Sequence, residues 1–199
     1  MGFKDLKRDY IIQSAKKLFL ANSISSVTIK DISAISGIGE ATIYRYFNNK
    51  ENLAIAVSLS IQKEILPNEE VFGDSKTGIE QLAAFFNLFK SIFTANPKYF
   101  SFISEFDTLY LKDLKNGDYS ISLDNFYDLF ISSYKKGLKD GSVKKVDNID
   151  LFYYTSTHSL LELCKKMAFS ESHLKQDKQV KKIDETEYLI SILISVLKA

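Results

Sequence analysis

The chain has 199 residues, of which 45% are apolar and 26% charged, with two prolines and one cysteine. This apolar share can supply a globular core, while a lone cysteine excludes an internal disulfide and favours a reducing, cytoplasmic location. No run of about 18 uninterrupted apolar residues occurs and the first residues lack the apolar segment of a secretory signal, so we expect no membrane span and no export.

The charge is unevenly distributed along the chain. Residues 1–50 carry eight Lys/Arg against four Asp/Glu, a net charge of +4, whereas the remaining residues carry 18 against 21, a net charge of −3. Two interpretations stay open on charge alone. The surplus is ordinary scatter, or the basic first quarter meets a polyanion such as nucleic acid.

The first predicted element is an amphipathic helix over residues 5–22. Apolar side chains recur there at the spacing of one helix face, at Ile11, Ala15, Leu18 and Phe19. Lysines occupy the positions between them, which predicts one buried and one solvated face.

Two short helices follow, separated by a tight turn. Thr28 with Asp31 three residues later is typical of a capping box, and Gly37 is suited to end the helix that it starts. A third helix is predicted over residues 40–47. Two short helices joined by a tight turn are typical of a helix-turn-helix, and a plain helical hairpin in an all-α protein is the alternative.

Longer helices are predicted in the rest of the chain. Asn48 is expected to cap a fourth helix that extends to about residue 66, with Glu51 at its third position. The polar segment 66–78 is expected to be a loop. Further helices are predicted over residues 78–94, 98–114, 120–139, 148–169 and 184–198. Asn96 is expected to cap a helix with Pro97 at its first position, and breaks are expected at Asn116–Gly117 and Asp140–Gly141–Ser142. The expected fold class is therefore all-α.

The third helix has a predicted inner and outer face. At about 100° per residue, Ile43 and Phe47 lie together and define the direction of the core. Arg45 then points away from the core. The other outward positions are Ala41 and Thr42 beside Arg45, and Tyr44 and Tyr46 on the two flanks.

This outer face is predicted to fit the major groove of DNA. Small residues permit close approach, an arginine can bond guanine O6 and N7, and flanking tyrosines can reach phosphates. Lys50 and Thr28, each at the start of a helix, offer further phosphate contacts. For the tyrosines, the alternative is that the rings pack at the rim of the core. The predicted DNA-binding residues are Thr28, Glu40, Ala41, Thr42, Tyr44, Arg45, Tyr46 and Lys50.

The segment TIKDISAISGIGEATIYRYFNNKENL, residues 28–53, resembles the DNA-binding segment of the TetR family of transcriptional regulators. The matching positions are Thr28, Ile29, Ile32, Gly37, Thr42, Ile43, Tyr44, Tyr46, Phe47, Lys50, Glu51 and Leu53. Two departures affect the third helix. Gly39 stands where serine is common, so a side-chain cap is lost, and Glu40 suits the helix N-terminus but repels phosphate, although it can accept a bond from a cytosine amine.

The resemblance implies a helix-turn-helix DNA-binding domain over residues 1–50 and a helical ligand-binding and dimerisation domain over residues 51–199. It implies a transcriptional regulator that binds double-stranded DNA, as a homodimer on a palindromic operator, and answers to a small-molecule effector. We expect a repressor, with no cofactor and no enzymatic activity. Dimerisation is predicted through residues 148–169 and 184–198, because YLISILISVL at 188–197 is apolar around most of its circumference; burial within one subunit is the alternative.

Aromatic residues are concentrated beyond residue 84, and most are expected to pack in the core. Many large rings pack irregularly and can leave a cavity that suits an apolar or aromatic ligand. The candidate lining residues are Phe89, Phe93, Phe102, Phe106, Tyr110, Phe126, Phe130, Tyr154 and His158. Two histidines and one cysteine do not make a metal site. The alternative function is an all-α enzyme acting on an apolar substrate, with Glu105, Asp107 or His158 as acid or base, but it leaves the outer face of the third helix unexplained.

Overall fold

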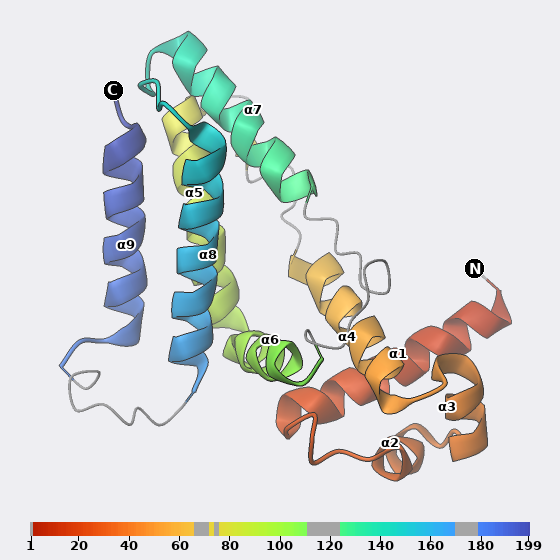
Figure 1. Cartoon of the computed structure of the whole chain (residues 1–199). Helices are drawn as coiled ribbons and strands as arrows, with labels where there is room; N and C mark the ends of the chain where they lie inside the picture. The colour runs from red at the N-terminus through yellow and green to blue at the C-terminus, as the bar shows by residue number, and fades with distance from the viewer. Residues whose placement is uncertain (1, 66–71, 74–75, 111–123, 170–178) are drawn as a thin grey trace. The chain divides into compact units, whose positions relative to one another are not determined.

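The computed structural model describes residues 2–65, 72–73, 76–110, 124–169 and 179–199, and most of these residues lie in α-helices (Figure 1). The helices are α1 (Phe3–Ala21), α2 (Ile29–Ser36), α3 (Glu40–Phe47), α4 (Lys50–Ile65), α5 (Gly78–Ala95), α6 (Pro97–Tyr110), α7 (Asp124–Asp140), α8 (Ile149–Ala168) and α9 (Lys182–Leu197). Among the described residues, β-type pairing is limited to one isolated bridge between Val143 and Lys198. The all-α prediction is confirmed.

The predicted helices agree with the observed ones to within a few residues at most ends. Helix α6 begins at Pro97 and α7 ends at Asp140, each within one residue of the predicted bound. Gly141 follows with a positive φ of 76°, which breaks the helix there. The break predicted at Asn116–Gly117 and most of the loop predicted over 66–78 lie outside the described residues.

The chain divides into two compact units, and the division differs from a boundary at residue 50. Unit 1 consists of Met1–Ile65 and Ser101–Ile121, and unit 2 consists of Leu66–Phe100 and Ser122–Ala199. Helix α4 therefore belongs to unit 1, and α6 carries residues of both units.

The core of unit 1 explains why α4 and the second half of α6 belong to it. On α1, Ile11 and Ala15 are fully buried, and Leu53 of α4 is fully buried as well. The ring of Phe19 on α1 stacks on Phe102 of α6, with the ring centroids 6.2 Å apart. Apolar burial on this scale is the main stabilising term in a small unit, so these helices form a common core with α2 and α3.

The helix-turn-helix in unit 1 is built by local signals. The backbone N–H of Asp31 donates to Oγ1 of Thr28 at 3.2 Å, and the N–H of Thr28 donates to Oδ2 of Asp31 at 2.8 Å. Gly37 ends α2 with φ 66°, a conformation that glycine adopts without steric cost. The predicted capping box and the predicted glycine end of α2 are confirmed.

The predicted cap of α4 was wrong by one residue. Asn48 ends α3 instead, with φ 67° and its N–H bonded to the carbonyl of Tyr44 at 2.7 Å. The side-chain oxygen of Asn49 accepts from the N–H of Asn52 at 2.8 Å, so Asn49 caps α4. Asparagine tolerates the left-handed region better than most residues, which allows Asn48 to turn the chain between the two helices.

Unit 2 contains α5, α7, α8 and α9 around an aromatic core. Phe85, Phe86 and Phe130 are fully buried. The rings of Phe85 and Phe86 meet edge to face at 5.4 Å, as do those of Phe85 and Phe130. Such edge-to-face pairs are a preferred packing geometry for aromatic rings, so they give this core a defined arrangement.

Helix α5 begins in direct backbone contact with the end of α7. A Cβ atom on Gly78 would lie 2.1 Å from the backbone nitrogen of Gly137. One on Gly137 would lie 2.3 Å from Cγ2 of Val143. Gly78 is therefore needed for α5 to approach α7 this closely, and Gly137 is needed for Val143 to pack against α7.

Candidate DNA interface

The inner and outer faces predicted for α3 agree with the burial of its residues. Ile43 and Phe47 are 0% and 4% exposed, whereas Arg45 is exposed and Tyr44 is 48% exposed. The guanidinium of Arg8 on α1 lies 5.2 Å from the ring centroid of Phe47, which holds that ring in a cation–π contact. Helix α3 is thus anchored by its inner side chains and presents Tyr44 and Arg45 to solvent.

The remaining α3 candidates surround Arg45. Glu40 and Ala41 are exposed, and Thr42 and Tyr46 are half-buried. The N-cap residue Gly39 makes no side-chain hydrogen bond, as its identity predicts. The first N–H groups of α3 therefore carry no protein side-chain cap beside Glu40, and this end of the helix remains open to a partner with acceptor atoms.

Thr28 lies at the start of α2 with its polar groups engaged. Its hydroxyl donates to Oδ2 of Asp31 at 2.6 Å. Hydrogen bonds from the Thr28 hydroxyl and backbone N–H lower the pKa of Asp31 below its ordinary value. Thr28 is exposed, so a phosphate contact stays a prediction, with the capping bonds as its competitor.

Lys50 contacts the protein backbone in this structure. Its Nζ lies 3.0 Å from the carbonyl oxygen of Ile24, 3.0 Å from that of Val27 and 3.4 Å from that of Ser25. The side chain is half-buried. All three partners belong to the connection between α1 and α2, so a phosphate contact by Lys50 remains untested and competes with these bonds.

Glu105 on α6 binds the same connection, which sequence reasoning missed. One carboxylate oxygen accepts from the N–H of Ile24 at 2.6 Å, and the other accepts from the N–H and the hydroxyl of Ser25 at 3.0 and 2.9 Å. In the sequence analysis, Glu105 is a candidate acid or base of the alternative enzyme. No local pattern could have revealed the contact, because the partners lie 80 residues away in the sequence.

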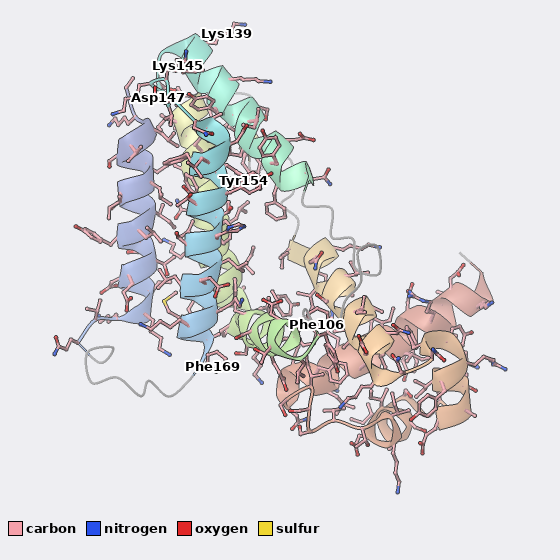
Figure 2. The ribbon with its side chains drawn as sticks, viewed as in Figure 1. Phe106, Lys139, Lys145, Asp147, Tyr154 and Phe169 are labelled. Atoms are coloured by element: carbon pink, nitrogen blue, oxygen red, sulfur yellow. The ribbon has the colours of Figure 1, made fainter. Side chains whose placement is uncertain are left out.

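The nine candidate ligand residues are divided between the two units. Phe102, Phe106 and Tyr110 belong to unit 1, and the other six belong to unit 2. Figure 2 shows Phe106 on α6 and Tyr154 on α8. Phe102 and Phe106 are 2% and 1% exposed and stack on one another at 6.0 Å. These two rings therefore act as core residues of unit 1.

The unit 2 candidates differ in exposure. Phe126 and Phe130 are buried at 8% and 0% exposure, whereas Tyr154 is 51% exposed. Phe89 and Phe93 are half-buried, and the side chain of His158 is exposed. Its ring centroid lies 6.1 Å from that of Tyr154, on the surface of α8.

Three tyrosines, two in unit 2 and one in unit 1, have pKa values raised above the ordinary value. The hydroxyl of Tyr127 donates to Oδ1 of Asp150 at 2.6 Å, and this bond raises its pKa. Burial, followed by the neighbouring Tyr154 and Tyr127, raises the pKa of Tyr153 to about 12. Burial also raises the pKa of Tyr110 in unit 1, with Glu51 and Glu105 adding to it. All three phenols are neutral at physiological pH and can serve as hydrogen-bond donors.

Two negative findings apply to the part of the chain that the structure describes. It contains no group of three or more His, Cys, Asp or Glu side chains placed to hold a metal ion. No helix within the described ranges has the length and apolar character required to cross a membrane.

This chain combines a helix-turn-helix that exposes an arginine with a helical second unit. That combination is typical of helix-turn-helix regulators. The family model for bacterial regulatory proteins of the tetR family matches residues 11–57. The HTH-type transcriptional regulator AlkX of Mycobacterium tuberculosis is 28% identical over 88 residues, which are 44% of this chain and 41% of that relative. The match thus spans about two fifths of the length of this curated relative.

Solved structures extend the similarity over nearly the whole chain. A TetR family protein of Vibrio parahaemolyticus has a TM-score of 0.59 and 20% identity, with 97% of this chain and 99% of that chain covered. The fatty acid degradation regulator FadR of Bacillus halodurans has a TM-score of 0.68 and 18% identity, with coverages of 98% and 96%. FadR of Bacillus subtilis, solved in complex with stearoyl-CoA, has a TM-score of 0.68 and 18% identity, with coverages of 94% and 97%. Residues 11–57 therefore match the regulatory proteins of the tetR family, and the chain as a whole shares the fold of these TetR family structures.

Proposed function

We propose that this protein is a DNA-binding transcriptional repressor that acts as a homodimer on a palindromic operator and leaves it when a small apolar or aromatic ligand binds. The observation that carries the proposal is the outer face of α3. Arg45 and Tyr44 are exposed there, over the buried anchors Ile43 and Phe47. A short helix with this division of side chains is suited to lie in a major groove.

The proposed contacts on α3 have different roles. Arg45 carries a planar fork of donors that matches O6 and N7 of guanine, so it would read a base. Tyr44 and Tyr46 would reach the groove walls, where phenol hydroxyls bond phosphate oxygens without reading sequence. Glu40 is exposed beside Ala41 and would accept from a cytosine amine or keep phosphate away from that edge.

Exposed apolar side chains on α8 and α9 support a homodimer. Tyr188, Ile192 and Val196 recur every four residues on α9 and are 71%, 43% and 41% exposed. On α8, Leu151 is 62% exposed and Tyr154 is 51% exposed. Covering such side chains with a second copy removes apolar surface from water, which favours association. A two-fold dimer would present two copies of α3, and hence favour a palindromic site.

The composition of unit 2 supports an apolar effector. Its second core cluster contains Phe100, Cys164 and Met167, with the half-buried rings of Phe89 and Phe93 packed against it. FadR of Bacillus subtilis, which shares the fold, was solved with stearoyl-CoA. We propose that Phe89 and Phe93 contact the ligand, because these half-buried residues pack against this cluster. A ligand would release DNA only by its differential affinity for the free and bound states, typically about 1–3 kcal/mol.

The function is tested by measuring binding to DNA from the region upstream of the protein's own coding sequence. Fluorescence anisotropy at several salt concentrations should show affinity well above that for random DNA of the same length. Binding should weaken steeply with salt, because phosphate contacts release counterions. Equal affinity for upstream and random DNA at every salt concentration would contradict an operator in this region, and no binding to either would contradict DNA binding itself.

A further inference from the structure

The connection between α1 and α2, residues 22–28, is bound by other side chains through its backbone N–H groups and through its backbone carbonyl oxygens. Ile24 and Val27 are 0% and 3% exposed, so their side chains anchor this connection in the core of unit 1. Backbone N–H and C=O groups next to buried side chains must find partners, because leaving them unpaired away from water is costly. Two charged side chains from distant helices supply those partners.

The two charges are matched to the groups that they contact. The carboxylate of Glu105 accepts from two N–H groups and one hydroxyl, at Ile24 and Ser25. The ammonium of Lys50 approaches three carbonyl oxygens, at Ile24, Ser25 and Val27. An anion on donors and a cation on acceptors both form charge-assisted hydrogen bonds, which are stronger than neutral ones.

The geometry at Lys50 bears on its role in DNA binding. An ammonium has three N–H donors, and Lys50 has three carbonyl oxygens within 3.4 Å of Nζ. Its donors are therefore directed at the connection between α1 and α2. A phosphate could replace one of these bonds only if the connection lost a partner.

This connection ends at the first residue of the helix-turn-helix. Thr28 is the N-cap of α2, and α2 packs against α3. A change in the backbone of residues 24–27 would therefore alter where α2 begins and how α3 is presented. Misplacing a recognition helix reduces the number of base contacts that it can make together.

We propose that Glu105 and Lys50 are positioning residues for DNA recognition, which clamp residues 24–27 and so orient the helix-turn-helix without touching a base. The proposal rests on the proposed function, but the clamp itself exists in the free protein. It assigns Glu105 a role that is neither catalytic nor ligand-binding. It also replaces the phosphate contact predicted for Lys50 by a contact within the protein.

The clamp is tested first without DNA, by amide hydrogen exchange in the full chain. In Glu105→Ala the amide protons of Ile24 and Ser25 should exchange about tenfold faster or more, because charge-assisted bonds are lost. Glu105→Gln keeps the shape but offers one acceptor oxygen, so its exchange rates should lie between those of Glu105→Ala and the unmodified chain. A side chain needed only for packing would instead tolerate glutamine fully.

A matched control separates the clamp from a general effect of charge. Glu162→Gln removes a carboxylate from α8, where it pairs with Lys165, three residues along the same helix, at 2.7 Å. Its Ile24 and Ser25 amides should exchange at the rates of the unmodified chain. Unchanged exchange in both Glu105 variants would overturn the clamp, whatever the protein does with DNA.

The second test uses the salt dependence of operator binding by Lys50→Met. If Lys50 positions the backbone, operator affinity should fall by about two- to thirtyfold. The slope of log affinity against log salt should then stay unchanged, whereas losing a phosphate contact would reduce the slope by about 0.9. A reduced slope with unchanged exchange at residues 24–27 would overturn the role proposed for Lys50. Absence of DNA binding by the unmodified chain would contradict the proposed function, while hydrogen exchange would still decide the clamp.

Discussion

Arg45 is exposed to solvent on α3, a helix that is firmly packed on its inner side. Its neighbours Ile43 and Phe47 are almost fully buried, so the helix that carries it is fixed to the core of unit 1. A side chain on a fixed helix loses less freedom on binding than one on a loop, which favours its use in base reading. Tyr44, the preceding residue, is 48% exposed and is the side chain proposed to contact the groove wall.

We expect Arg45→Ala to relax sequence preference. The substitution should cost about 1–3 kcal/mol per half-site and reduce discrimination at one base position, because a bidentate contact to guanine is lost. Tyr44→Phe, which removes only a hydroxyl, serves as the comparison and should weaken all sequences alike. Selection from randomised operators measures both effects. If Arg45→Ala weakened operator and random DNA equally, Arg45 would be a phosphate contact.

At the scale of elements, the start of α5 depends on the segment after α7. The N–H of Gly78 donates to Oδ2 of Asp140 at 2.8 Å, and the N–H of Ile79 donates to Oγ of Ser142 at 3.1 Å. These bonds satisfy N–H groups that have no partner within the helix. The hydrogen bonds from Ser142 and from the backbone of Gly78 lower the pKa of Asp140 below its ordinary value of 3.8.

We expect Asp140→Asn to destabilise the protein at neutral pH but not in strong acid. A carboxylate with a lowered folded-state pKa stabilises the fold above its unfolded pKa, and this stabilisation disappears as pH falls through the folded pKa. The difference in urea midpoint between the variant and the unmodified chain should therefore be present at pH 7 and shrink below pH 3.8. A pH-independent difference would show that the charge on Asp140 contributes nothing.

At the scale of the whole molecule, the proposed dimer gives a function to the exposed apolar residues of unit 2. Leu151 on α8 and Tyr188 and Ile192 on α9 range from 43% to 71% exposed. Scattered exposed apolar residues are normal on protein surfaces, but a row along one helix face indicates a partner. A second copy is the occupant that the proposed binding to a palindromic operator requires.

We expect sedimentation at micromolar concentration to show a dimer, and Ile192→Glu and Leu151→Glu to shift it toward monomer. A charge placed in an apolar interface loses its water without gaining a partner, which is strongly unfavourable. Ser132→Glu adds the same charge at an exposed position of α7 and should leave the dimer intact. A monomeric unmodified chain would contradict the dimer and with it the palindromic operator.

Features set by neighbours along the chain were predictable from the sequence. The Thr28–Asp31 capping box, the glycine that ends α2 and the buried pair Ile43 and Phe47 all depend on residues within a few positions of each other. The same is true of the TetR resemblance, because residue types and spacing within one short segment carry it. Local hydrogen bonding and helical periodicity can be inferred directly from residue types and their spacing along the chain.

The tertiary structure alone decided which distant residues meet. It placed Glu105 on backbone groups 80 residues away and directed the ammonium of Lys50 to carbonyl oxygens of the α1–α2 connection. It also divided the candidate ligand residues between two units. Such contacts depend on how helices pack, and packing is determined by the combined burial and hydrogen bonding of many residues, which no short sequence pattern records.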